Sequence, residues 1–254
     1  WLDQYGTDQD DYADALAMNE DGSIIYLGGR SSGVFQTGVT PSKTDFFGMR
    51  FNSSGERLWT LQSGTADIDV LTDLVVRDDD SVYFVGNTYG TFEQDNLSRN
   101  SDVMLGRIDA DGNLLWATQF YSEGSSALSV NIDSQGNLLV GGSTQSVLDN
   151  TSNLGGLDAF LASYDASGNR NWLQQNPIST TEDDEVHAIM STSNGLYAAG
   201  HTGGDYMGAN YGSYDFFLIK FDESGNLQSA DGPPINPTVT IEGDATSSNK
   251  SPAS

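Results

Sequence analysis

DFFGMRFNSSGERLWTLQ, residues 45–62, is a stretch that the chain repeats four times. It returns as DVMLGRIDADGNLLWATQ from Asp102 and as DAFLASYDASGNRNWLQQ from Asp158. The fourth copy, DFFLIKFDESGNLQSADG from Asp215, carries Ser229 where the other copies carry Trp. Self-similarity at a nearly constant spacing indicates stacked copies of one supersecondary unit.

The four Trp residues stand at positions 1, 59, 116 and 172, so the period is 56 to 58 residues. Each copy divides into four short strand candidates that are separated by turn signals, and Gly stands at or near the left-handed position of the turns. In the first copy the candidates are 13–18, 24–29, 46–51 and 57–62. Strands such as FFGMRF and AFLASY are apolar on successive positions, which is typical of strands buried on both faces. This pattern predicts an all-β fold, a β-propeller.

We expect four blades of four antiparallel strands, and Trp1 to Gly6 as an outer strand. Its predicted partner is 216–221, so that the N-terminal strand completes the last blade and the ring closes. An open ring would leave two apolar blade faces exposed. The alternatives are a fragment of a larger propeller and an array completed by another chain. The propeller is expected over residues 1–232, and the Pro/Gly/Ser-rich residues 233–254 read as a linker or the start of a following module.

The charge balance is extreme, with 36 acidic and 10 basic residues. Nucleic acid and anionic membranes are therefore poor partners, because both need Lys and Arg to neutralise phosphate. No apolar run approaches the ~20 residues of a membrane span. The 26 aromatic residues (4 Trp, 11 Tyr and 11 Phe) argue against a disordered acidic chain. There is no Cys, which excludes disulfides and thiolate metal sites. The start at Trp1, without Met or signal peptide, reads as that of a processed or excised piece.

Two segments of each copy carry a family resemblance. DALAMNEDGSIIYLGG (14–29) and DAFLASYDASGNRNW (158–172) represent them. This pattern resembles the bacterial β-propeller repeat known as the SBBP repeat, over residues 1 to about 232. The resemblance implies a secreted or cell-surface protein, often with Ig-like or adhesion modules beside the propeller, and assembly with other modules of a larger protein. The family usually has more than four blades and carries no defining catalytic motif, so the resemblance implies a scaffold and no reaction.

One acidic position recurs just before the innermost strand of each copy. Asp11, Asp69 and Asp184 occupy it, and Ser125 takes the place in the third copy. In a closed ring these side chains would converge near the axis at one mouth of the channel. Three carboxylates and a hydroxyl suit a hard cation, so the pattern predicts a Ca²⁺ site. The alternative is that these Asp residues cap turns by accepting hydrogen bonds from backbone N–H groups.

The loops between the second and third strands vary most between copies. They are 30–44, 87–101, 143–157 and 201–214. Long ordered loops on a rigid scaffold are where binding tends to occur. The fourth loop combines Tyr and Asn with Gly, which suits adaptable contact with a sugar or protein surface. The ligand-binding candidates are Tyr206, Asn210, Tyr211, Tyr214 and His201. The alternative is that one apolar or aromatic residue in each loop plugs the blade edge, namely Phe35, Phe92, Leu148 and Tyr206.

Catalysis has little support in the sequence. The two His residues, His187 and His201, stand at repeat positions that other copies fill with different residues, which favours polar residues at a blade edge. Carboxylate pairs abound, but in so acidic a chain most are expected to be solvated. We therefore predict no catalytic residue. The expected function is an extracellular or cell-surface binding or structural module that contacts protein or glycan through one loop face. The alternatives are a lectin-like carbohydrate binder and a polysaccharide lyase or hydrolase that uses loop carboxylates.

Overall fold

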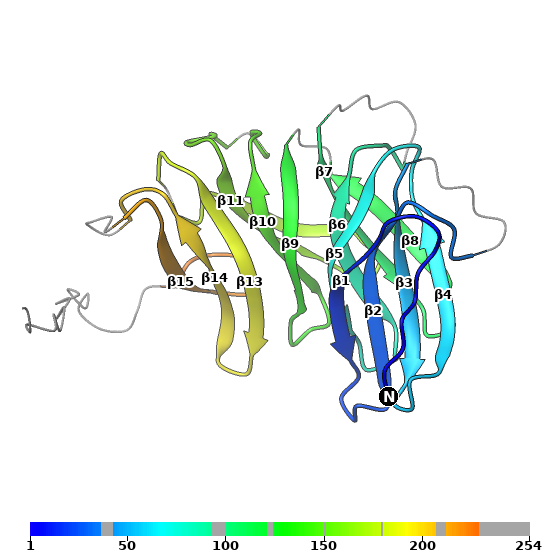
Figure 1. The fold of residues 1–254 in the computed structure, drawn as a ribbon. Coiled ribbons are helices and arrows are strands. Elements are labelled where there is room, and N and C mark those ends of the chain that lie inside the picture. The colour runs from blue at the N-terminus through cyan, green and yellow to red at the C-terminus, as the bar shows by residue number, and fades with distance from the viewer. Residues whose placement is uncertain are drawn as a thin grey trace, which may run out of the picture.

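The structure is a computed structural model that describes residues 1–36, 43–92, 100–120, 124–149, 151–178, 180–206 and 212–228. Within these ranges there are fifteen strands in four antiparallel sheets (Figure 1). No helix in the described ranges is long and apolar enough to cross a membrane.

Each sheet is one blade whose strands pair in chain order. The first blade consists of β1 (Asp11–Met18), β2 (Ile24–Ser31), β3 (Asp45–Asn52) and β4 (Arg57–Ser63). The second consists of β5 (Asp69–Val76), β6 (Val82–Thr88), β7 (Asp102–Ile108) and β8 (Leu114–Phe120). The third consists of β9 (Ser125–Ile132), β10 (Leu138–Thr144), β11 (Asp158–Tyr164) and β12 (Arg170–Gln175). The fourth consists of β13 (Asp184–Thr192), β14 (Gly195–Thr202) and β15 (Asp215–Phe221). The predicted all-β fold of propeller-type blades is confirmed.

A bulge near the start of the innermost strand fixes one Gly in each blade. In β9 the pairing register shifts where β10 changes from Gly141 to Gly142, and a Cβ on Gly142 would lie 1.9 Å from the carbonyl oxygen of Ser126. No side chain fits at that distance, so only Gly is possible. The equivalent glycines of the other blades are Gly29, Gly86 and Gly200, where the same clash would occur at 1.8 to 2.0 Å.

The hydrophobic core lies between neighbouring blades. One cluster joins the first and second blades around Leu71 and Phe84. A second joins the second and third blades around Leu105, and a third joins the third and fourth around Leu161. The residues of β7, β10 and β11 are almost all buried, on both faces of the sheet. This agrees with the continuous apolar runs in the sequence.

Each Trp links its own blade to the next one. The Trp59 indole Nε1 donates to the carbonyl oxygen of Ala110, 3.0 Å away in the β7–β8 turn. Gly112 in that turn has a φ of +90°, and a Cβ there would lie 2.9 Å from the indole ring. Trp116 and Trp172 repeat this contact at 3.3 and 2.8 Å on the turns that contain Gly168 and Gly225. We call this contact the Trp–Gly clasp.

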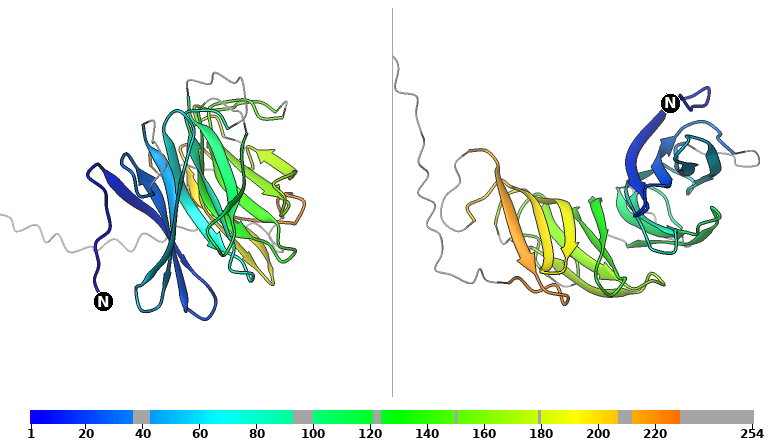
Figure 2. Two further views of the ribbon diagram at one scale, coloured as in Figure 1. Left: turned by 90° about the vertical axis from the view of Figure 1, so that its right-hand side faces the viewer. Right: turned by 90° about the horizontal axis from the view of Figure 1, so that it is seen from below.

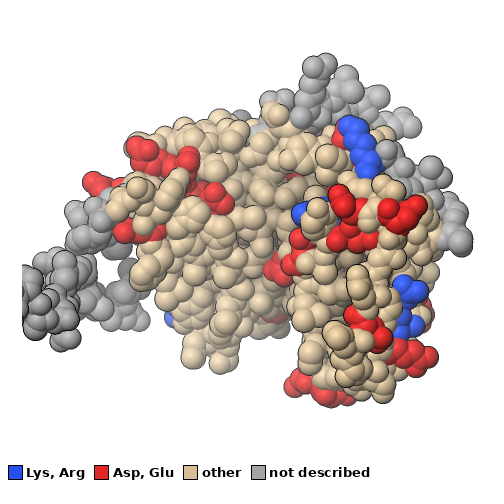
Figure 3. All heavy atoms as spheres, in the orientation of Figure 1, with Lys and Arg blue, Asp and Glu red and all other residues tan. Residues whose placement is uncertain are grey.

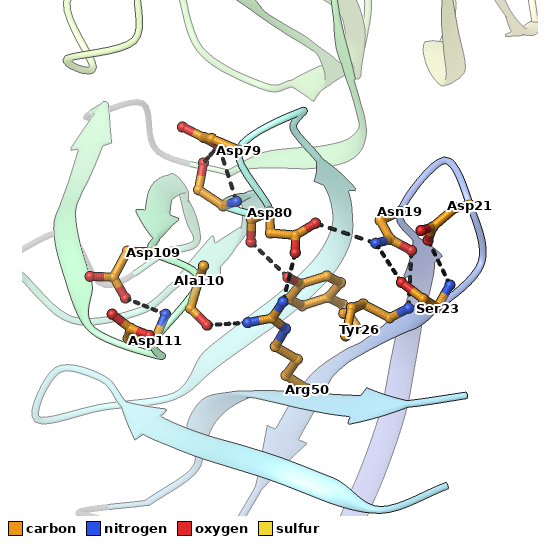
Figure 4. A network of polar contacts seen from close by, with 12 residues as sticks. Asn19, Asp21, Ser23, Tyr26, Arg50, Asp79, Asp80, Asp109, Ala110 and Asp111 are labelled. Carbon is orange, nitrogen blue, oxygen red and sulfur yellow. Dashed lines mark hydrogen bonds and ion pairs between the residues drawn. The ribbon is translucent and has the colours of Figure 1, made fainter. Parts of the chain in front are cut away.

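Charged groups reinforce the first junction, as Figure 4 shows. Arg50 donates through Nη1 to the carbonyl oxygen of Ala110 at 2.5 Å and through Nη2 to Asp80 at 2.7 Å. The Tyr26 hydroxyl donates to the Asp80 carbonyl oxygen at 2.6 Å, and the Asn19 amide reaches the Asp80 carboxylate at 3.4 Å. Arg50 therefore joins the first blade to the second through an acidic partner and a backbone carbonyl.

The N-terminal segment does not complete the last blade, so that prediction is wrong. Trp1 donates to the carbonyl oxygen of Ser53 at 3.1 Å, and a Cβ on Gly55 would lie 2.6 Å from its ring. The Tyr5 hydroxyl donates to the Gly55 carbonyl oxygen at 3.3 Å. The physical reason is that the blades form an open arc, which keeps the first and fourth blades apart (Figure 2). Trp1 therefore packs on the turn of the first blade, as each other Trp contacts the turn of the following copy.

At the other end, the chain itself occupies the edge that the N-terminal strand was expected to fill. Leu227 forms an isolated bridge with Phe221, and the Gln228 amide donates to the Lys220 carbonyl oxygen at 2.8 Å. Ser229 and the predicted linker 233–254 lie outside the described residues.

The four blades form an arc, and the first and fourth lie at opposite ends of it (Figures 1 and 2). Strand β1 packs against β5, β5 against β9, and β9 against β13. Leu16 on the outer face of the first blade is 66% exposed, whereas its equivalent Leu74 is 5% exposed. Phe216 in the fourth blade is 90% exposed, whereas its equivalent Phe46 is fully buried. Both end faces of the arc are therefore uncovered, as expected for an open ring, and the closed ring of four blades is not formed.

Candidate functional site

The predicted cation ligands are bound to neighbours within their own blades. Asp69 is fully buried and accepts hydrogen bonds from the Thr65 amide at 2.6 Å and the Thr65 hydroxyl at 3.0 Å. Burial raises the pKa of the Asp69 carboxyl to about 6, against the lowering effect of hydrogen bonds from Thr88 and Thr65. The carboxylate thus caps the turn that precedes β5.

Asp11 and Asp184 repeat this arrangement. Asp11 accepts from the Thr7 amide at 2.6 Å, and Asp184 accepts from the Thr180 hydroxyl at 2.7 Å. In the third blade the Ser125 hydroxyl donates to Thr144 Oγ1 at 2.6 Å. The equivalent position of the four residues is confirmed. They lie in separate blades of an open arc, and among the described residues their carboxylates form no cluster with oxygen atoms within 4.8 Å of one another. The structure does not bring them together, so Ca²⁺ stays a prediction without geometric support.

A buried Asp–Gln pair anchors the long loop of each of the first three blades. Gln119 donates through Nε2 to the Asp102 carboxylate at 2.7 Å and to the Gly90 carbonyl oxygen at 3.0 Å. Its Oε1 accepts from the Phe92 amide at 3.2 Å. The equivalent pairs are Gln62 with Asp45 and Gln175 with Asp158. The leading Asp of each of these three copies thus has a structural role. The Gln partner was missed, although its recurrence at the end of three copies was the available signal.

The predicted ligand-binding residues fall into three groups. Tyr206 is half-buried and packs against the core cluster of the fourth blade, in the same way as the loop residues Phe35, Phe92 and Leu148 pack in theirs. Asn210 and Tyr211 lie outside the described residues. Tyr214 is exposed and places its ring edge-on to His201, with ring centroids 4.9 Å apart. Ligand binding by these residues stays a prediction.

The structure brings together a group that the sequence did not reveal, composed of Glu185, His187 and His201. His187 Nε2 lies 3.0 Å from His201 Nδ1, and the two rings stack with centroids 4.9 Å apart. The Glu185 carboxylate lies 3.7 Å from His187 Nε2 and 3.9 Å from His201 Nε2. One ligand atom from each residue lies within 4.8 Å of the others, and this is the one such group of three among the described residues. We call it the His–Glu cluster.

Strand pairing explains how the cluster forms. Glu185 on β13 lies directly opposite His201 on β14, and a register shift between Val186 and Ala188 brings His187 beside them. Phe216 on β15 is the next residue across from His201. The cluster and the exposed apolar side chains of β15 therefore share the outer face of the fourth blade.

Acidic side chains gather at both ends of the face shown in Figure 3, and the middle of that face carries few charges. Arg50 and Arg107, at equivalent positions of the first two blades, pair with nearby carboxylates, and Arg107 Nη2 lies 2.7 Å from Asp79. Lys220, the equivalent in the fourth blade, instead lies over the Tyr197 ring, 5.8 Å from its centroid.

Two hollows open between the turns of neighbouring blades, with volumes of about 470 and 550 Å³. Asp78 lines both of them. The carboxyls whose pKa is raised, in each case chiefly by burial, lie elsewhere, namely Asp45, Asp69, Asp73 and Asp184. The hollows and the perturbed carboxylates thus do not coincide, whereas active sites usually combine the two.

Comparison with known proteins does not assign the chain to a family. No protein-family model matches the chain. The regulatory protein FlaEY of Caulobacter vibrioides is 31% identical over 146 residues, which cover 52% of this chain and 15% of that protein. This chain therefore corresponds to a small part of that relative.

Solved structures that match this chain include a xylan β-1,4-xylosidase from Bacillus halodurans C-125, with 15% identity, a TM-score of 0.44, and coverage of 87% of this chain and 43% of that one. Another is the GH43_1 enzyme from Xanthomonas citri complexed with xylotriose, with 8% identity, a TM-score of 0.41, and coverage of 88% and 91%. With identities and TM-scores this low, these similarities say nothing about the residues of the site.

Proposed function

We propose that this chain is a binding or structural module of the β-propeller type, whose interaction surface is the outer face of the fourth blade. The molecule that this face binds is a further blade of the same repeat, supplied in solution by a second copy of the chain. The SBBP-type repeat, and the secreted or cell-surface location that it implies, belong to this proposal.

The observation that carries the proposal is the equivalence of covered and uncovered positions. Leu105 and Leu161 are buried at the second and third junctions, where the next blade covers them. Leu218 occupies the same position in the fourth blade and is 69% exposed, beside Phe216. Contiguous exposed apolar side chains on a sheet face mark an association site. The complementary surface is the outer face of the first blade, around Leu16, so the contact is head to tail.

A catalytic role finds no such support. The geometry that repeats between blades commits Asp69 and Asp184 to turn caps, and the Asp–Gln pairs to loop anchors. The loops so anchored are a second surface, through which contact with protein or glycan is part of the same proposal.

The test is self-association measured by sedimentation velocity over a range of protein concentration. Moderate salt is needed to screen the net charge of −26. We expect concentration-dependent association of the wild-type protein and its loss in Leu218→Glu. Leu115→Glu is the matched control, because Leu115 is also exposed but lies on the outer strand β8. A wild-type protein that stays monomeric, or a Leu218→Glu variant that associates as the wild type does, would overturn the proposal.

A further inference from the structure

We propose that the His–Glu cluster binds a divalent transition-metal ion, with Zn²⁺ as the representative. His187 Nε2 and His201 Nδ1 are the first two ligand atoms and lie 3.0 Å apart. Two nitrogens bound tetrahedrally to Zn²⁺ at ordinary bond lengths lie ~3.3 Å apart, so a small rotation of the rings suffices. The Glu185 carboxylate, 3.7 Å from His187 Nε2, supplies the third ligand.

The rings are already held in place without the ion. Glu185 and His201 are cross-strand partners on β13 and β14, and the bulge at Val186 sets His187 on the same face. The Tyr214 ring packs edge-on against His201. Ligands mounted on paired strands bind a metal with little loss of conformational freedom.

The three positions carry metal-binding chemistry only in the fourth blade. The chain has two His residues, and both are in this cluster. The strand registers identify the equivalent residues of the other blades, which offer no such combination: Tyr12, Asp14 and Arg30; Val70, Thr72 and Asn87; Ser126, Leu128 and Ser143. The joint appearance of two imidazoles and a carboxylate, against the background of the repeat, points to a local function.

The second blade shows what these positions do when they are covered. The Thr72 hydroxyl donates to the Ala127 carbonyl oxygen at 2.7 Å, and the Asn87 amide donates to the Ser126 hydroxyl at 3.0 Å. Both bonds cross the junction to the next blade. The His–Glu cluster therefore lies where the fourth blade faces outward. Three protein ligands leave the fourth tetrahedral position of Zn²⁺ for water or for a donor from a bound molecule.

The ligand set also selects the metal. Imidazole nitrogens suit Zn²⁺, Cu²⁺ and Ni²⁺, whereas Ca²⁺ and Mg²⁺ prefer all-oxygen sites. The inference goes beyond the proposed function and does not depend on it, because the three ligands come from one chain.

The experiment titrates metal-free protein with Zn²⁺ by isothermal calorimetry, and with Co²⁺ by visible absorption, at a concentration where sedimentation shows a monomer. We expect one ion per chain and the d–d bands of a nitrogen-ligated Co²⁺. The double variant His187→Thr with His201→Asn carries the residues of the second blade, so its fold is expected to persist, as circular dichroism and Tm will show. Its Zn²⁺ affinity should fall more than about 100-fold, beyond the loss typical of outer-shell changes.

Non-specific binding to so acidic a chain needs its own controls. Glu20→Gln removes an exposed carboxylate far from the cluster and should leave Zn²⁺ binding unchanged. An excess of Ca²⁺ should not displace Zn²⁺. If the folded double variant binds Zn²⁺ as tightly as the wild type, or if the wild type binds none, the metal site is refuted. Self-association measured with a chelator present separates the two proposals, because Leu218→Glu alters that readout and leaves all three ligands in place.

Discussion

The junction between the third and fourth blades and the outer face of the fourth blade use the same repeat positions, but only the junction is covered. Leu161 is 1% exposed at the junction, and Leu218, its equivalent, is 69% exposed on the outer face. Both side chains are leucine on the third strand of their blades. Each copy of the repeat therefore forms an apolar sheet face. Where a neighbouring blade covers this face, its burial stabilises the fold, and where no blade covers it, the face is available for association.

The largest expected effect tests that comparison directly. Leu161→Ala should lower the free energy of unfolding by about 4 kcal/mol, because it removes buried methyl groups and leaves a cavity. Leu218→Ala should change it by less than about 0.5 kcal/mol, as for an exposed site. Urea unfolding of the monomer measures both. Equal losses would contradict the comparison, because they would mean that Leu218 is buried within the monomer.

A second prediction compares the buried carboxylate of Asp69 with the carboxylate of Asp109 in the β7–β8 turn. Its pKa is raised from 3.8 to about 6 by burial. The neutral carboxyl is thus favoured in the folded state, so its contribution to stability is complete below pH 3.8 and is lost as the pH rises to about 6. Between these limits the wild-type protein should lose roughly 2 kcal/mol more stability than Asp69→Asn.

Unfolding in urea at pH 4.5 and at pH 7 measures this slope. Asp109→Asn is the control, because hydrogen bonds from Asn113 and nearby amides lower the pKa of Asp109, and a lowered pKa affects stability only in more acidic solution. A slope that Asp69→Asn leaves intact would place the titration elsewhere. Asp45, Asp73 and Asp184 are shifted in the same direction and are the next positions to test.

The smallest expected effect compares the Trp59–Gly112 clasp, which lies at a junction between two blades, with the contact of Trp1 on Gly55 at the end of the arc. Gly112→Ala places a Cβ 2.9 Å from the Trp59 ring at a φ of +90°. Gly55→Ala has the same φ problem, at +86°, but meets Trp1, which is 70% exposed and can move away. Both variants should be destabilised by the strained backbone, and Gly112→Ala by about 1 kcal/mol more. Thermal unfolding compares them, and an equal loss would mean that the ring of Trp59 yields as easily as that of Trp1.

The sequence predicted the blades because each is written several times. Apolar runs such as FFGMRF, followed by a Gly turn, identify a buried strand in every copy. Repetition also located the shared position of Asp11, Asp69 and Asp184. It could not show whether the ring closes. Trp1 was assigned to the last blade because a Trp is absent there, whereas within the described residues the fourth sheet contains only β13, β14 and β15, and the Trp1 indole packs on the turn of the first blade.

The His–Glu cluster shows a different limit. His187 and His201 were each interpreted alone, as variable residues at a blade edge. Their proximity arises from the bulge at Val186, which shifts the pairing register so that His187, although not itself paired, lies beside the Glu185–His201 pair. The bulge lies opposite Gly200, where the two strands approach closely, and the alternation of residues along a strand does not reveal such a bulge.

The Trp–Gly clasp has a consequence for how such a chain changes its size. The indole is encoded near the end of one copy, and its carbonyl and glycine partners are encoded in the next, so the genetic unit is offset from the folded unit. After duplication or loss of a whole copy, a Trp is therefore still followed by a copy whose turn supplies its carbonyl and glycine partners. The architecture is therefore tolerant of changes in blade number, and length variation among such proteins requires no redesign of the contacts between blades.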